Sequence, residues 1–127
     1  MQLTGHGGEI YCCKFHPNGK ILASAGFDRQ LFLWNTFGEC ENYAILTGHK
    51  GSVLDLHFSV EGDYLYTASS DRTINYWDVE TGSRIKRMKG HTSIVNACGA
   101  SRRGPNLMVS GGDDCQVSFV KKSFSNY

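Results

Sequence analysis

The sequence has little proline, no excess of charge of either sign and no long hydrophobic run. Only two prolines stand among its 127 residues, and thirteen lysines and arginines against twelve aspartates and glutamates leave a formal charge of +1. A nearly neutral chain is not drawn to polyphosphates by its overall charge, so contact with nucleic acid would depend on a local patch. No apolar run approaches the roughly 18 residues of a membrane-spanning helix, and the first residues do not resemble a signal peptide. We therefore expect no membrane partner.

The spacing of cysteines that is typical of metal sites is also missing. The five cysteines are odd in number and contain no C-x-x-C pair; they are Cys12, Cys13, Cys40, Cys98 and Cys115. A disulfide framework or a zinc site is therefore disfavoured. No Gly-rich phosphate loop or nucleotide motif interrupts the chain either. We expect no metal and no cofactor.

Glycine, in contrast, is abundant, and it separates short apolar runs. Fifteen glycines are about twice the usual share, and this indicates many turns. The runs between the turns are rich in β-branched and aromatic residues, which favours strands over helices. The predicted strands are residues 10–15, 21–25, 31–34 and 43–46, followed by 53–58, 64–67, 73–77 and 84–88.

The turns and runs repeat. Gly-His occurs at residues 5–6, 48–49 and 90–91, with spacings of 43 and 42 residues. In the first two copies an aspartate follows the histidine by 22 residues and a tryptophan follows the aspartate by six. The third copy is one residue longer and has Val120 in the position of tryptophan. We therefore predict three units of four antiparallel strands, at about 5–47, 48–89 and 90–127, with the last one incomplete.

Gly-His, an aspartate and then Trp-Asn or Trp-Asp at these spacings closely resemble the WD-repeat β-propellers. The resemblance covers about residues 3–120 and weakens from Gln116 to Tyr127, where Trp-Asp is missing. It implies an all-β fold, in which residues 1–127 form a partial propeller. Because a closed propeller needs about four to eight blades, we expect about three four-stranded antiparallel blades in an open arc.

The resemblance also implies a role for the recurring polar residues. In this family the turn aspartate accepts hydrogen bonds from the Gly-His imidazole and from loop N–H groups. The imidazole bonds a strand hydroxyl, and that hydroxyl meets the tryptophan indole. Carried over, the structural sets are His6, Ser24, Asp28 and Trp34; His49, Thr67, Asp71 and Trp77; and His91, Ser110 and Asp114. A hydrolase would need one such set rather than three, so we predict no catalytic residue and no enzyme.

Propellers of this family present one narrow face to peptides and proteins. The positions implied for that face flank the first strand of each repeat and precede the turn aspartate; they are Glu9, Tyr11, Phe27, Ser52, Leu54, Ser70, Ile94, Asn96 and Asp113. Exposed aromatic and apolar side chains there would suit the centre of an interface. The alternative is that these side chains pack against neighbouring loops.

Two segments, GHGGEIYCCKFHPNGKILASAGFDRQLFLWN and KGHTSIVNACGASRRGP, are similar to those of WD-repeat proteins of the spliceosome. This implies a nuclear, non-catalytic protein-interaction scaffold in pre-mRNA splicing. Its expected partners are spliceosomal core proteins, and open blade faces would allow self-association. The alternative is a truncated or vestigial repeat product without binding activity of its own.

Two further features leave alternatives open. Between Thr81 and Gly112 the chain has six basic residues and no acidic one; they are Arg84, Lys86, Arg87, Lys89, Arg102 and Arg103. They could face RNA or an acidic partner, although a solvated edge is the simpler interpretation. Asp55 and His57 lie two residues apart in one predicted strand and share a face. We expect them to be a solvated pair on an outer strand.

Overall fold

The structure, a computed structural model, describes residues 2–37, 42–102 and 107–121. Within these ranges the chain forms strands and no helix, so none is long and apolar enough to cross a membrane. The strands are β1 (Ile10–Phe15), β2 (Ile21–Gly26), β3 (Leu31–Asn35), β4 (Asn42–Leu46), β5 (Val53–Phe58), β6 (Tyr64–Ser69), β7 (Thr73–Asp78), β8 (Arg84–Lys89), β9 (Val95–Ala100), β10 (Leu107–Gly112) and β11 (Val117–Lys121). In the first two repeats these bounds lie within about two residues of the strands expected from turn residues and apolar runs.

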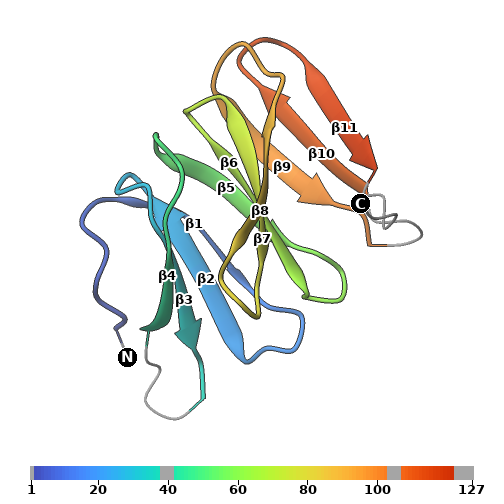
Figure 1. Cartoon of the computed structure of the whole chain (residues 1–127). Helices are drawn as coiled ribbons and strands as arrows, with labels where there is room; N and C mark the ends of the chain where they lie inside the picture. The colour runs from blue at the N-terminus through green and yellow to red at the C-terminus, as the bar shows by residue number, and fades with distance from the viewer. Residues whose placement is uncertain (1, 38–41, 103–106, 122–127) are drawn as a thin grey trace.

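The strands form three separate antiparallel sheets. Their orders are β1-β2-β3-β4, β5-β6-β7-β8 and β11-β10-β9, so each sheet comes from one repeat. Three strands of the last sheet are described. Figure 1 shows the sheets side by side, with the first and third sheets at the two ends of an open arrangement. The prediction of antiparallel blades in an open arc is confirmed.

The same tight turn joins the second and third strands of each sheet. The residue after the turn aspartate has a positive φ in all three repeats: 69° at Arg29, 73° at Arg72 and 65° at Cys115. This left-handed conformation is unfavourable for a side chain other than glycine. The aspartate offsets the cost because its carboxylate accepts the N–H two residues on, at 2.9 Å for Thr73 and 3.0 Å for Gln116.

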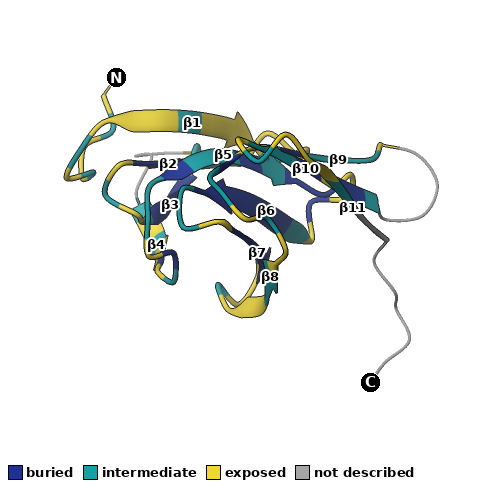
Figure 2. Cartoon of the chain, turned by 90° about the horizontal axis from the view of Figure 1, so that it is seen from above, coloured by how far each residue is buried: buried dark blue, intermediate teal, exposed yellow. Residues whose placement is uncertain are grey.

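The hydrophobic core lies between the sheets. Alternate residues of each strand point to opposite faces, so one sheet can contribute to two interfaces. The first and second sheets enclose one buried cluster, which includes Leu31, Leu33, Leu56, Leu65 and Trp77. The second and third sheets enclose another, made of Tyr66, Ala68, Ile74, Tyr76, Val95, Cys98 and Met108. In Figure 2 the two central strands of the second sheet, β6 and β7, are accordingly buried along most of their length.

A histidine joins the first two sheets at the end of β1. His16 Nε2 lies 2.9 Å from the carbonyl oxygen of Gly62, while its Nδ1 accepts the Asn18 N–H at 3.0 Å. Its ring also meets the Phe58 ring edge-on, with 5.1 Å between centroids. Gly62 has a φ of 85°, and a Cβ there would lie 2.2 Å from the imidazole, so glycine permits this approach.

The expectation for Asp55 and His57 is wrong. Their strand, β5, is the first strand of its sheet and lies beside β1 and β9 of the neighbouring sheets. The Asp55 carboxylate accepts the backbone N–H of Cys98 on β9 at 3.1 Å, and His57 lies 3.6 Å away. Burial would raise the pKa of Asp55, but bonds from His57 and Cys98 outweigh it and lower the pKa. Asp55 therefore connects two sheets.

Candidate functional site

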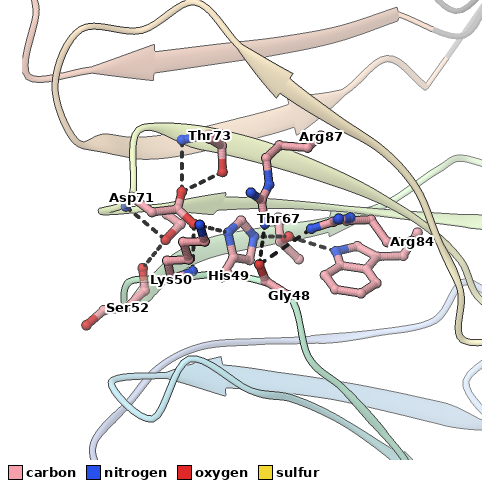
Figure 3. A network of polar contacts seen from close by, with 11 residues as sticks. Gly48, His49, Lys50, Ser52, Thr67, Asp71, Thr73, Arg84 and Arg87 are labelled. Carbon is pink, nitrogen blue, oxygen red and sulfur yellow. Dashed lines mark hydrogen bonds and ion pairs between the residues drawn. The ribbon is translucent and has the colours of Figure 1, made fainter.

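The second repeat contains a continuous chain of polar contacts, shown in Figure 3. His49, just before β5, places Nδ1 2.9 Å from the Asp71 carboxylate and Nε2 2.6 Å from the Thr67 hydroxyl on β6. The Trp77 indole on β7 donates to the same hydroxyl at 2.9 Å. The chain therefore ties the loop before the sheet to its two central strands.

The roles of the atoms in this network follow from their chemistry. The indole N–H can only donate and an ionised carboxylate can only accept. The Thr67 hydroxyl therefore accepts from Trp77 and turns its own proton to His49 Nε2, and Nδ1–H donates to Asp71. Each side-chain polar atom of this network thus has a hydrogen-bond partner, which avoids the cost of an unpaired buried group.

Asp71 also organises its surroundings through both carboxylate oxygens. One oxygen accepts the backbone N–H of Lys50 at 2.9 Å, and the other accepts the N–H and the hydroxyl of Thr73. Burial would raise the pKa of Asp71, but the bonds from His49, Thr73 and Lys50 outweigh it and hold the pKa well below its usual range.

The first repeat has the same arrangement. His6 lies 2.8 Å from both the Asp28 carboxylate and the Ser24 hydroxyl, and the Trp34 indole donates to that hydroxyl at 2.8 Å. The Gly7 N–H donates to Asp28 at 2.9 Å. Burial raises the pKa of Asp28, but the bonds from Gly7 and His6 lower it further than burial raises it.

The third repeat lacks the last donor. His91 lies 2.9 Å from both the Asp114 carboxylate and the Ser110 hydroxyl, and Thr92 N–H donates to Asp114 at 2.9 Å. In the sequence, the position that matches tryptophan holds a valine, Val120. The Ser110 hydroxyl therefore lacks the indole donor that its counterparts have. Hydrogen bonds from Thr92, Gln116 and His91 lower the pKa of Asp114 despite its desolvation.

The three hydroxyl groups of these sets are closed off from solvent. Ser24 is 5%, Thr67 0% and Ser110 3% exposed. A nucleophile must reach its substrate, and in the first two sets the hydroxyl also holds an indole N–H. The arrangement can fix strands and loops, but it does not present a reactive oxygen to a ligand.

We expect Asp71→Ala to lower the free energy of unfolding by about 1–3 kcal/mol, because it leaves the His49 imidazole and the Lys50 N–H without their acceptor. Urea denaturation of the wild type and the variant measures this difference. Asp63→Ala is the matched control, since this exposed aspartate lies in a turn of the same sheet. Equal stability of Asp71→Ala and wild type would contradict a structural role for the set.

The same carboxylates predict a loss of stability in acid. Asp28, Asp71 and Asp114 have lowered pKa values in the folded chain, so they stabilise it above the unfolded value of about 3.9. This contribution is lost as the pH falls below about 4 and through the folded values. Urea denaturation between about pH 5 and pH 2 should show a smaller loss for Asp71→Asn than for wild type. If the unfolding free energies of wild type and Asp71→Asn fell equally with pH, a contribution of Asp71 to this loss of stability would be ruled out.

The positions expected at a partner-binding face recur at one end of the sheets. In each repeat a backbone N–H from the turn between the second and third strands donates to the carbonyl of the residue just before the first strand. The pairs are Phe27 to Glu9 at 2.8 Å, Ser70 to Ser52 at 2.9 Å and Asp113 to Ile94 at 2.9 Å. The structure thus places six of the nine residues in three matching pairs.

Exposure differs among these residues. Phe27 and Tyr11 are 56% and 49% exposed, whereas Leu54 is half-buried. Asn96 and Asp113 are exposed and bonded to each other, with 2.6 Å between the amide nitrogen and the carboxylate oxygen. The aromatic part of this set is therefore concentrated on the first sheet.

Sequence reasoning missed several contacts between residues that are far apart in the sequence. The Asp55 bond to Cys98, the His16 bond to Gly62 and the guanidinium contacts of Arg84 and Arg87 with Gly48 all end on backbone atoms. A backbone acceptor or donor leaves no residue type to recognise. The sequence does mark Asp55 as unusual, because it is an acidic residue within an apolar run. The corresponding positions of the first and third repeats hold the uncharged residues Cys12 and Ala97.

Comparison with known proteins agrees with the repeat geometry. The profile of the family described as WD domain, G-beta repeat, matches residues 1–35, 40–78 and 82–120. The U5 small nuclear ribonucleoprotein 40 kDa protein of Homo sapiens is 73% identical over 117 residues, which are 92% of this chain and 33% of that protein. The protein of the same name from Dictyostelium discoideum is 53% identical over 114 residues, which are 90% of this chain and 32% of that protein.

A fungal protein is similar over the same part of the chain. Pre-mRNA-splicing factor cwf17 of Schizosaccharomyces pombe is 41% identical over 117 residues, which are 92% of this chain and 34% of that protein. The chain thus spans about a third of the length of these curated relatives. The resemblance drawn from the Gly-His, Asp and Trp spacing is confirmed, and the chain belongs to the WD-repeat family.

Proposed function

We propose that the chain is a non-catalytic protein-interaction scaffold that acts in pre-mRNA splicing in the nucleus, as part of the U5 small nuclear ribonucleoprotein. The observation that carries this proposal is the 73% identity over 92% of the chain to a protein of that name. Because the chain spans about a third of that relative, the proposal concerns the surface that these three repeats provide.

We propose that the three histidine, hydroxyl and aspartate sets are structural. Their recurrence in each sheet and the burial of the hydroxyls support this assignment. In each set the carboxylate also accepts a loop N–H, which a catalytic aspartate that only orients histidine would not need. These features together favour a scaffold over a hydrolase.

We propose that partner proteins bind at the end of the sheets where the three backbone pairs recur. Phe27 and Tyr11 support this choice because they are large, aromatic and about half exposed. Aromatic side chains dominate the energetics of many protein interfaces, since they bury a large area with few rotatable bonds. The expected partners are proteins of the U5 particle.

Affinity capture from nuclear extract tests this proposal. The tagged wild-type chain should retain proteins of the U5 particle, identified by mass spectrometry, and Tyr11→Ala/Phe27→Ala should lose most of them. The matched control is Phe37→Ala, because Phe37 is 60% exposed and follows β3 at the other end of the first sheet.

Two outcomes would contradict the proposal. Capture that is equal for wild type and Tyr11→Ala/Phe27→Ala would show that the partner binds elsewhere. Absence of U5 proteins above the background of untagged beads would favour the alternative of a repeat product without binding activity of its own.

A further inference from the structure

The outermost strand of the second sheet is unusually basic. β8 has the sequence Arg84-Ile85-Lys86-Arg87-Met88-Lys89, so four of its six residues are cationic. The corresponding strand of the first sheet, β4, has the sequence Asn-Tyr-Ala-Ile-Leu and no charge. Positive charge on an outer strand is therefore a feature of the second repeat among the described strands and not of the repeat in general.

One edge of β8 is free. In the sheet order β5-β6-β7-β8 it pairs only with β7, and no other strand in the described ranges pairs with it. Figure 2 shows β8 at the far end of its sheet from β5, away from the neighbouring sheets. A free edge offers a row of unpaired backbone N–H and C=O groups to an added strand.

The charge of this strand is not neutralised within the described chain. Every ion pair found there joins a histidine to an aspartate, so no carboxylate pairs with the cations of β8. Arg84 and Arg87 direct guanidinium nitrogens to the carbonyl of Gly48, a neutral acceptor, as Figure 3 shows. Nε of Arg87 is buried and has no partner among the described residues.

The exposed side chains of β8 combine charge with one apolar group. Arg84, Lys86 and Lys89 are exposed, and Ile85 is 49% exposed. The aromatic residues of the adjacent strand are buried, since Tyr76 is 8% and Trp77 1% exposed. Nucleic acid bound without helical structure is held largely by stacking on exposed aromatics, which β8 and β7 do not offer. The combination therefore favours a peptide over RNA.

We propose that the free edge of β8 binds an extended acidic segment of a partner protein, which adds to the second sheet as a fifth strand. Its backbone would pair with the unpaired groups of β8, and its carboxylates would meet the exposed cations. An apolar side chain of the segment would cover Ile85. The strand is six residues and therefore about 20 Å long, so a segment of similar length would fill it. This surface is distinct from the one that contains Phe27 and Tyr11.

Fluorescence anisotropy with synthetic peptides tests this inference on the whole chain. The probe is a labelled octapeptide of alternating glutamate and valine, and the same peptide with lysine in place of glutamate is the charge control. A third peptide has the same glutamate and valine sequence but carries N-methyl groups on backbone amides of both of its edges. These groups prevent it from pairing as a strand. A labelled oligouridine serves as the nucleic acid probe.

The structure predicts that the acidic peptide binds at about 150 mM salt and that the N-methylated and basic peptides bind at least about tenfold more weakly. Lys86→Glu/Lys89→Glu should weaken binding of the acidic peptide by about tenfold or more. Lys14→Glu/Lys20→Glu changes net charge equally on exposed residues of the first repeat and should alter affinity by less than about twofold. Circular dichroism and thermal melts establish that both variants are folded.

Three results would overturn the inference. Equal binding of the N-methylated peptide would mean that charge alone attracts it. Tighter binding of oligouridine, lost in Lys86→Glu/Lys89→Glu, would assign the strand to RNA. No binding, or an equal effect of both charge-reversal pairs, would contradict the proposed peptide site. The basic residues would then serve only to keep other chains from pairing with an exposed edge. None of these results bears on capture through Phe27 and Tyr11, so the two proposals fail independently.

Discussion

Trp77→Ala is expected to lower the free energy of unfolding by about 3–5 kcal/mol, which is a large part of the roughly 5–15 kcal/mol that stabilises a typical domain. Trp77 is 1% exposed and belongs to the cluster between the first and second sheets. The substitution opens a cavity in that cluster and removes the indole N–H that Thr67 accepts. Urea denaturation followed by circular dichroism measures the difference in stability between wild type and variant.

Two control variants separate these contributions. Trp77→Phe keeps much of the ring but loses the indole donor, so it should cost less than Trp77→Ala and more than nothing. Phe37→Ala removes an aromatic ring that is 60% exposed and should change stability by less than about 0.5 kcal/mol. A loss of stability for Trp77→Ala no greater than that for Phe37→Ala would contradict the assigned core.

The isolated chain is expected to associate in solution through the outer faces of its first and third sheets. The outer face of the first sheet includes Phe15, 64% exposed, and Ile45, 50% exposed. On the third sheet Val109 and Val117 are 40% and 76% exposed and line a shallow apolar hollow. Apolar faces of this kind are covered between neighbouring sheets inside the molecule, so a second copy can cover them here.

Sedimentation equilibrium measures this association. The apparent mass of the wild type should exceed the mass of one chain and should rise with concentration. Phe15→Glu/Ile45→Glu should lower this apparent mass toward the mass of one chain. Val60→Glu is the control, because Val60 is 42% exposed in the turn between β5 and β6. A single species with the mass of one chain at all concentrations would refute the prediction.

Much of the fold could be predicted because the local and repeating signals agree. Turn residues and β-branched runs fix where each strand begins and ends, and the Gly-His period assigns strands to sheets. The Trp77 and Thr67 contact followed from the family resemblance, and the structure brings these side chains within 2.9 Å. The sequence reflects these elements strongly because each depends on a side chain of a particular type.

The contacts between sheets were not predictable in the same way. From the sequence we expected Asp55 on an outer strand. Its spacing from His57 shows that the two share a face but does not show the order of strands within the sheet. Its acceptor role depends on the backbone N–H of Cys98, 43 residues away. Within the second repeat, Arg87 on β8 reaches the carbonyl of Gly48 in the loop before β5, 39 residues away. Such contacts follow from how strands, loops and sheets pack in space and have no signature in local sequence.

The protonation of the histidine rings tests the central claim that three buried networks each tie a loop to the strands of one sheet. Long-range ¹H–¹⁵N spectra at about pH 8 report which ring nitrogen carries the proton. The networks predict Nδ1–H for His6, His49 and His91, because Nδ1 faces a carboxylate and Nε2 a hydroxyl. His16 provides the internal contrast, with Nε2–H, because its Nδ1 accepts a backbone N–H. Nε2–H in the three network histidines, or the same tautomer in all four, would contradict the account.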